Sequence, residues 1–393
     1  MTPELARLIL AQICLHTCMT GLRMATPLLA LSQGYSPAAV GVLLALFALT
    51  QVFLALPAGR YADRHGLRRP IAYSVLAAVA GAGAAAAFPV FPVLCLSALL
   101  TGGASGAAVI SLQRHVGRAA SGGQQLRQVF SWLSIGPAVS NFLGPLSAGL
   151  LIDHAGPVPA SMMGYRMAFA LMALLPLASW LLVRPTRELP PLEVKHASQR
   201  PATWDLLCEP MFRRLMLVNW FLASCWDVHT FVVPVLGFER GLSASVIGSI
   251  LGAFAVAATL VRMLLPLVAA RVSEWRVLAA AMLSTAVLFA AYPFMTSAWT
   301  MGLCSLLLGV ALGTVQPMIM SLLHQITPEA RHGEALGLRL MAINASSVVM
   351  PILFGSAGAV IGIAAVFWLT GLAVGLGSRA AWLLKDSLEA PHR

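Results

Sequence analysis

The stretch PLLALSQGYSPAAVG at residues 27–41 returns 207 residues later as PVLGFERGLSASVIG at residues 234–248. A proline, two glycines and a serine keep their places in both copies. Similar offsets relate further small residues and prolines: Gly102 and Gly106 to Gly309 and Gly313, and Pro145 and Gly149 to Pro351 and Gly355. The sequence therefore predicts two related halves.

Composition places both halves in a membrane. Of the 393 residues, 59% are hydrophobic and 10% are charged, and the mean hydropathy is +0.84. A bilayer span needs about 20 mostly apolar residues. Segments of this kind are predicted at 5–31, 38–58, 70–90, 92–113, 127–151, 163–183, 213–236, 244–267, 276–295, 298–322, 335–356 and 360–384. The predicted fold is an all-α membrane protein with twelve transmembrane helices in two six-helix bundles.

Basic residues set the expected orientation. With both termini in the cytoplasm, Arg166 and Arg240 lie outside and Arg23 and Arg262 within spans, while the other Lys and Arg occupy cytoplasmic segments or helix ends. This pattern explains the net charge of +11 without nucleic acid. We expect a multi-pass protein of the cell inner membrane, with bundles at 1–183 and 213–393 joined by a proline-rich cytoplasmic linker at 184–212.

Catalysis, metals and cofactors find little support. The six cysteines are scattered without the spacing of a disulfide or zinc framework. There is no phosphate-binding loop of the G-x-x-x-x-G-K-[ST] type, and no mid-span carboxylate pair, nucleophile triad or metal cluster. We therefore expect no enzyme, no metal and no cofactor.

A charged loop joins the second and third predicted spans and reads GRYADRHGLRR at residues 59–69. It resembles the G-x-x-x-D-R-x-G-R-R signature of major facilitator transporters, with Leu67 in place of a basic residue. The resemblance implies the major facilitator fold and a cytoplasmic gate that latches the halves. Its residues are Gly59, Asp63, Arg64, Gly66, Arg68 and Arg69. Alternatively, the arginines act only as topology determinants.

The fifth predicted span contains SNFLGPLSAG at residues 140–149. This is similar to the G-P-x-x-G-G motif of the proton-coupled drug and metabolite efflux branch, with Ser140 and Ala148 where glycines are usual. The resemblance implies a kink at Gly144, Pro145 and Gly149 that seals the outer side and favours export. A kinked helix that serves packing alone is the alternative.

Asp227 is the one acidic residue in the middle of a predicted span. Because an ionised side chain at that depth costs at least about 2.5–3.5 kcal/mol, it is a functional candidate, and we assign it proton coupling. The repeat places Asp227 level with Thr20 and one turn from Arg23. We predict that Arg23 and Asp227 approach each other across a central cavity, or else form a purely structural pair.

Other polar residues in spans are candidates for lining the substrate cavity. On the first and seventh spans they are Gln12, His16, Thr20, Arg23, Asn219, Trp226, His229 and Thr230, and on the fourth, fifth, tenth and eleventh they are Gln113, Asn141, Gln316 and Asn344. Hydrogen bonding between helices is the alternative for the His, Gln and Asn residues. Arg262 and Arg339 lie near cytoplasmic helix ends, where we expect their side chains to snorkel.

The sequence thus predicts a secondary active transporter that exports a small organic molecule by proton antiport and alternating access. Arg23 and His16 suggest an anionic metabolite or chelator. Proton-coupled uptake of a small nutrient and a non-transporting membrane receptor are the alternatives. The expected partners are the small-molecule substrate, protons and the lipid bilayer, and a monomer suffices because two halves complete a cavity.

Overall fold

The computed structural model describes residues 2–119, 132–133, 135–188, 203–268, 273–327 and 332–388. These residues form α-helices and short 3-10 helices, and no strand occurs among them. Eleven segments are long and apolar enough to cross a membrane. Another helix, α6, lies at the fifth predicted span. In the part of the chain that the structure describes, each predicted span therefore contains helix, and the all-α membrane fold is confirmed.

The chain forms two compact units. Unit 1 comprises residues 1–194 and 233–252, and unit 2 comprises residues 195–232 and 253–393. The change from one unit to the other near residue 194 falls inside the predicted linker. The end of α8 (Pro210–Glu239) and the start of α9 (Ala244–Val268) belong to unit 1, while the rest of both helices belongs to unit 2.

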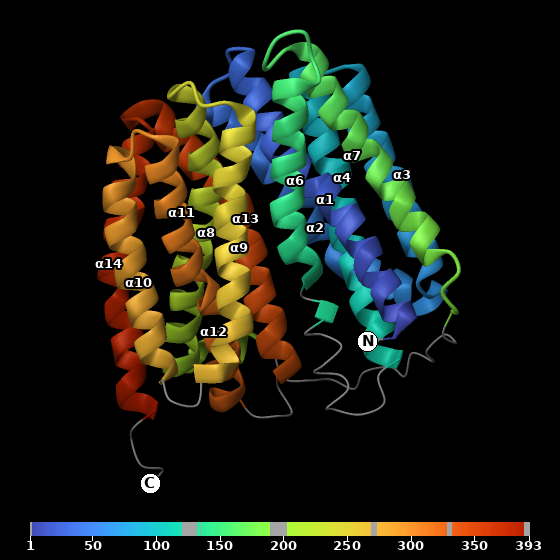
Figure 1. The fold of residues 1–393 in the computed structure, drawn as a ribbon. Coiled ribbons are helices and arrows are strands. Elements are labelled where there is room, and N and C mark those ends of the chain that lie inside the picture. The colour runs from blue at the N-terminus through green and yellow to red at the C-terminus, as the bar shows by residue number, and fades with distance from the viewer. Residues whose placement is uncertain are drawn as a thin grey trace. The chain divides into compact units, whose positions relative to one another are not determined.

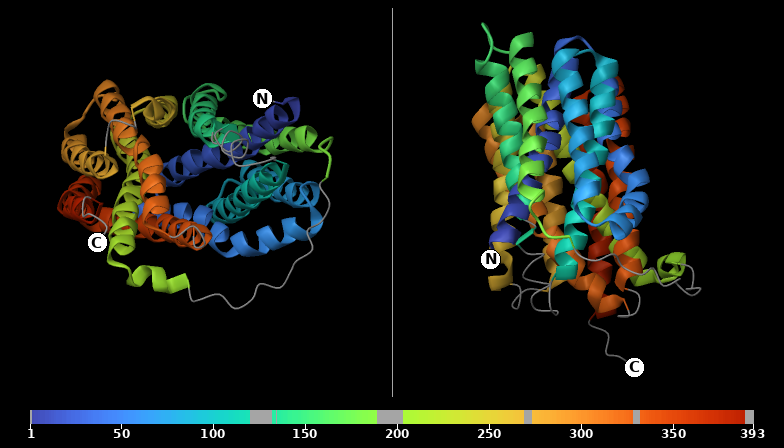
Figure 2. Two further views of the ribbon diagram at one scale, coloured as in Figure 1. Left: turned by 90° about the horizontal axis from the view of Figure 1, so that it is seen from below. Right: turned by 90° about the vertical axis from the view of Figure 1, so that its right-hand side faces the viewer.

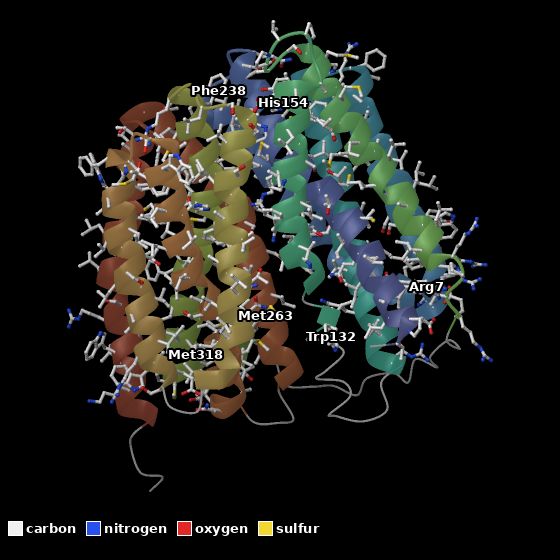
Figure 3. The ribbon with its side chains drawn as sticks, viewed as in Figure 1. Arg7, Trp132, His154, Phe238, Met263 and Met318 are labelled. Carbon is white, nitrogen blue, oxygen red and sulfur yellow. The ribbon has the colours of Figure 1, made fainter. Side chains whose placement is uncertain are left out.

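Unit 1 is a bundle of long helices that stand side by side (Figures 1 and 2). Its complete helices are α1 (Pro3–Ser32), α2 (Pro37–His65), α3 (Arg68–Ala87), α4 (Phe91–Ala119), α6 (Ile135–His154) and α7 (Met162–Val183). Helix α1 packs against α6 and α7, α2 packs against α4, and α3 packs against α4 and α7. Figure 3 shows Arg7 near the start of α1 and His154 at the end of α6, at opposite ends of this bundle.

Unit 2 contains most of α8 and α9 together with five further helices. These are α10 (Glu274–Ala291), α11 (Ala298–Gly313), α12 (Val315–Ile326), α13 (His332–Ile361) and α14 (Ile363–Leu388), with 3-10 turns η1 (Thr203–Cys208) and η3 (Tyr292–Phe294). Helix α10 packs against α11, α12 and α14, and α13 packs against α14. Figure 1 shows α10 and α14 side by side.

The tenth predicted span is one apolar segment, Ala298–Leu323, in which the helix is interrupted at a single residue. Helix α11 ends at Gly313 and α12 begins at Val315, with Thr314 between them. Pro317 lies in the first turn of α12, where its missing N–H costs no hydrogen bond within that helix.

The repeated stretch builds the same corner twice in unit 1. Gly34 and Gly241 both have positive φ, +84° and +68°, which glycine adopts without steric cost. Two residues later, the hydroxyls of Ser36 and Ser243 accept hydrogen bonds from Ala39 N and Val246 N at 3.4 Å. The repeat therefore encodes one turn and one helix cap.

The repeat also sets a close helix contact in each unit. In unit 1, a Cβ added at Gly102 of α4 would collide with the carbonyl oxygen of Phe47 in α2. In unit 2, a Cβ at Gly309 of α11 would collide with the carbonyl oxygen of Phe254 in α9. Phe47 and Phe254 differ by the same 207 positions as the glycines. The two halves thus share tertiary contacts as well as sequence.

Candidate functional site

Asp227 is a buried carboxylate in the middle of α8, and its side chain is 4% exposed. Two neighbouring serines of α13 hold it. Ser347 Oγ donates to Asp227 Oδ1 at 3.2 Å and to Oδ2 at 3.3 Å, and Ser346 Oγ donates to Oδ2 at 3.4 Å. Ser224, one turn before Asp227, bonds to Ser346 Oγ at 3.2 Å. Hydroxyls can donate to an ionised carboxylate and accept from a protonated one, so these partners suit both forms.

An equivalent helix contact occurs in unit 1. Thr20, which the repeat aligns with Asp227, donates from Oγ1 to the carbonyl of Ser140 in α6 at 2.8 Å. The offset of 206 carries Ser140 onto Ser346. The polar position of α1 therefore meets α6 as the polar position of α8 meets α13, with a hydroxyl in one unit and a carboxylate in the other.

Two arginines of unit 2 contact residues of α8, an arrangement that the sequence did not predict. Arg339 of α13 is 6% exposed, and its Nε donates to Asn219 Oδ1 of α8 at 3.1 Å. Arg262 of α9 donates from Nε to Gly313 O at 3.4 Å, and its guanidinium lies 5.5 Å from the ring centroid of Trp226. The positive charges of Arg262 and Arg339 repel each other.

Both arginines contact residues of α8 inside unit 2, while snorkelling of their charged ends stays a prediction. The guanidinium of Arg262 packs over Trp226, which lies well inside α8, and Arg339 is buried. The spacing of residues along α8 and α13 was the one sequence signal that could have indicated these contacts. Asn219 and Trp226, seven residues apart, share a face of α8, as Arg339 and Ser346 share a face of α13. Because Arg262 and Arg339 lie near helix ends, the sequence did not point to their contacts with α8.

His229 belongs to a fully buried hydrogen-bonded cluster in unit 2. Its Nε2 lies 2.9 Å from Ser305 Oγ, which in turn lies 2.8 Å from the hydroxyl of Tyr292. The imidazole also stacks on Phe254, with ring centroids 4.2 Å apart. This arrangement matches a helix–helix hydrogen-bond partner, the alternative that the sequence left open.

The remaining cavity candidates occupy varied environments in their own units. His16 is half-buried, and its Nδ1 lies 2.9 Å from Ser105 Oγ. Thr230 Oγ1 donates to the carbonyls of Trp226 and Asp227 in its own helix, both at 3.1 Å. Gln12 is buried, Arg23, Asn141 and Asn344 are half-buried, and Gln113 and Gln316 are exposed. Their assignment to a substrate cavity stays a prediction.

A carboxylate anchors the charged loop between α2 and α3. Glu188 accepts hydrogen bonds from Leu67 N at 2.8 Å and Arg68 N at 2.6 Å, at the start of α3. The side chain of Arg68 donates to the carbonyl of Thr186. Gly66 has φ +75°, as a tight turn requires. The loop is thus held by residues just beyond α7, which the sequence analysis did not anticipate.

The other members of the predicted gate differ in how they are placed. Arg64 and Arg69 are exposed, and the side chain of Asp63 lies outside the described residues. Among the described residues, a Cβ added at Gly59 would meet Ile110 Cγ2 at an ordinary 3.8 Å. A latch between the halves stays a prediction.

Small residues of α6 pack tightly within unit 1. A Cβ at Gly144 would collide with Thr20 Oγ1 of α1, and one at Gly149 would lie 2.5 Å from Ala244 O. Pro145 lies inside α6, and its carbonyl would be 2.5 Å from a Cβ at Gly248. Neighbouring helices therefore approach α6 closely on both sides of the proline.

Asp153, near the end of α6, caps the start of α9. Its Oδ1 accepts from Ala244 N at 3.1 Å and its Oδ2 from Ser245 N at 2.7 Å, at the start of α9. Asp153 is 8% exposed. A carboxylate at a helix N-terminus satisfies free N–H groups and complements the helix dipole. This buried acid therefore has a structural role within unit 1.

Comparison with known families decides the class of protein. The family model described as the Major Facilitator Superfamily matches residues 8–321 and, in a second match, residues 215–393. The chain belongs to the major facilitator superfamily. The second match begins near the start of α8, so the family pattern is found again in the later part of the chain.

Solved structures of major facilitator transporters share this fold. A bacterial homologue of the human lysosomal transporter Spinster, inward-facing and unoccupied, has a TM-score of 0.80 at 14% identity, with all of both chains covered. A D-xylose–proton symporter has a TM-score of 0.80 at 14% identity over 96% of each chain. The nucleoside transporter NupG has a TM-score of 0.72 at 16% identity over 98% of this chain and 100% of its own. No curated protein matches the sequence.

Membership of the major facilitator superfamily makes this chain a multi-pass membrane transporter with a small-molecule substrate. Transport, and not catalysis, is the activity that the family supports. Among the described residues, no group of three or more His, Cys, Asp or Glu side chains is arranged to hold a metal ion. At these low identities, solved relatives establish the fold alone.

Proposed function

We propose that this chain exports a small organic molecule with an anionic group, by alternating access and in exchange for protons. The environment of Asp227 carries the proposal. A buried carboxyl that lies in the middle of a spanning helix and contacts two serine hydroxyls can gain or lose a proton without losing these partners. Asp227 is therefore our proton carrier.

Export is supported by the resemblance of α6 to the efflux branch and by its packing. Gly144 and Gly149, on either side of Pro145, leave no room for a side chain against their neighbours in unit 1. Such a seam can close one side of the protein to leakage while the other is open. The efflux-branch assignment rests on this segment.

A positive charge within a membrane-spanning helix supports an anionic substrate. Arg23 is a half-buried cation on the same helix as the polar residues Gln12 and Thr20. In our proposal, it attracts the anionic group of the substrate. We further propose the cell inner membrane, with both termini cytoplasmic, as the location, because this orientation agrees with the distribution of basic residues.

The proposal can be tested in inverted membrane vesicles with an acidified interior, whose pH is followed by a quenched acridine dye. Citrate, 2,3-dihydroxybenzoate and 2-naphthoate are added outside as probes. Antiport predicts that at least one probe enters while protons leave, so that the dye signal recovers. Asp227→Asn should abolish this recovery but keep exchange of labelled probe for unlabelled probe, because exchange needs no net proton movement.

Vesicles without the chain control for passive entry of weak acids. Asp205→Asn, in an exposed acid of η1, is the matched control and should behave as the wild type. Recovery that survives in Asp227→Asn would refute the proton-carrier assignment. If none of the three probes caused the dye signal to recover, the export of organic anions would be refuted.

Proton-coupled uptake is the second candidate, since the fold is shared with a D-xylose–proton symporter. In right-side-out vesicles with an acidic exterior, uptake predicts accumulation of a probe together with protons. Export by antiport predicts no such accumulation, so the two vesicle orientations separate the candidates.

A further inference from the structure

Several hydrogen-bond donors around Arg262 and Arg339 have no acceptor among the described residues. Each guanidinium has five N–H donors. Among the described residues, each of the two arginines uses only its Nε, for Gly313 O and Asn219 Oδ1 respectively. Asn219 is 2% exposed, and its Nδ2 has no partner. The Nη groups of two arginines and one amide group are therefore available.

In the part of the chain that the structure describes, no carboxylate compensates the two positive charges. Arg262 and Arg339 repel each other, and neither pairs with a carboxylate in the described part of the chain. A buried charge is normally paired, because removing it from water costs several kcal/mol. Uncompensated cations in a membrane protein mark a substrate or ion pathway by default. An anion would supply both the missing charge and the missing acceptors.

We propose that Arg262 and Arg339, with Asn219 and Trp226, bind the carboxylate of an aromatic organic acid. This deepens the proposed function by naming the chemical class of the substrate. A carboxylate fits the planar fork of a guanidinium with two parallel hydrogen bonds, and a second guanidinium neutralises the remaining charge.

Trp226 provides the reason to expect an aromatic body on this acid. Its indole is half-buried, packs edge-on against Phe254 with ring centroids 4.5 Å apart, and lies under the guanidinium of Arg262. A ring attached to the carboxylate can use the apolar surface of Trp226 while its charged end contacts the arginines. Simple inorganic anions lack this contact.

The test measures binding to the full chain purified in detergent, with no membrane and no gradient. 2-Naphthoate is the probe, and 2-naphthamide, which has the same shape without the charge, is the control ligand. We expect naphthoate to bind and naphthamide to bind at least about tenfold more weakly, since hydrogen bonds to charged groups are the stronger kind. Equal binding of the two ligands would overturn the proposal.

Variants identify the site. Arg262→Gln and Arg339→Gln should each weaken naphthoate binding about tenfold or more. Arg276→Gln is the matched control, because Arg276 is an exposed arginine of unit 2 whose guanidinium also lies over a tryptophan, 5.3 Å from the Trp275 centroid. It should bind as the wild type. Unchanged affinity in both Gln variants would overturn the proposal.

A structural role for the two arginines predicts a different result. If they only stabilised the fold, the Gln variants would unfold at lower temperature, whereas relief of repulsion between two cations predicts an unchanged or higher midpoint without ligand. If a Gln variant fails to fold, naphthoate binding is measured on the Arg→Lys variant at the same position. Lysine keeps the charge but loses the fork, so binding should weaken by about threefold or more, and unchanged affinity would count against the site.

This binding experiment is separate from the transport experiment. Arginine-dependent binding of naphthoate without proton-driven movement would refute the antiport proposal and leave the site in place. Proton-driven movement of naphthoate that both Gln variants retain would refute the site and leave the antiport proposal in place.

Discussion

The close contact between α9 and α11 gives the sharpest structural prediction. Replacing Gly309 with Ala places a methyl against the backbone of Phe254, 3.1 Å from its carbonyl carbon and in collision with its oxygen, and 3.0 Å from Ala257 Cβ. Neither the carbonyl group nor a Cβ atom can rotate away. The two helices must therefore separate locally, and overpacking of this kind costs typically about 1–3 kcal/mol.

Gly302→Ala is the matched control on the same helix, because a Cβ there meets nothing within 4 Å. Ala stabilises an unobstructed helix relative to Gly by about 0.5–1 kcal/mol, and this gain is common to both variants. The difference between the variants is then the overpacking cost alone, about 1–3 kcal/mol. At about 2–4 °C per kcal/mol for a domain of this size, Gly309→Ala should unfold several degrees below Gly302→Ala.

The assay is thermal unfolding in detergent, followed by tryptophan fluorescence and checked by size-exclusion chromatography of heated samples. Equal midpoints for the two variants, or a more stable Gly309→Ala, would refute the close backbone contact. The repeat supplies an independent test in unit 1. Gly102→Ala, against the carbonyl of Phe47, should be less stable than Gly83→Ala, whose added Cβ meets nothing within 4 Å.

Three further contacts give predictions of similar kind. Asp153→Ala removes the cap of α9 and should lower the unfolding free energy by about 1–2 kcal/mol, seen as a lower thermal midpoint. Glu188→Gln weakens the charge-assisted cap of α3, and loss of about 1 kcal/mol should speed hydrogen exchange at residues 67–68 about fivefold. Ser305→Ala leaves His229 Nε2 and the Tyr292 hydroxyl without this partner and should cost about 1–3 kcal/mol, while Ser284→Ala, exposed on α10, should be near neutral.

Much of the fold was accessible from the sequence because membrane helices leave a strong local signal. Each backbone polar group must be satisfied within the segment, so a long apolar run is a helix. The repeated Gly34 and Gly241 indicated the duplication from sequence alone, and the structure adds that both have the positive φ that glycine adopts easily. The one-residue interruption at Thr314 leaves the span intact, because Pro317 in the first turn of a helix does not interrupt an apolar run.

The candidate site was less accessible, because it depends on which faces of different helices meet. Asp227 stood out as an acid in an apolar span, but its serine partners on α13 could not be assigned from sequence. Arg262 and Arg339, in contrast, did not stand out in the sequence as members of a site. Their position near helix ends suggested an interfacial role, while the direction of each side chain, toward Trp226 and Asn219, is a property of packing.

The sequence by itself determined the membrane class, the helices, the duplication and the loop that resembles the family signature. These features follow from hydropathy, from turn residues and from residues that recur along the chain. Tertiary structure decided which small residues bring backbones together, that Glu188 and Asp153 cap helices far away in the sequence, and that two arginines share one region of unit 2. The physical reason is that hydrogen bonds and charge repulsion act over a few ångströms in space. The sequence specifies such proximities only through the packing of the whole unit.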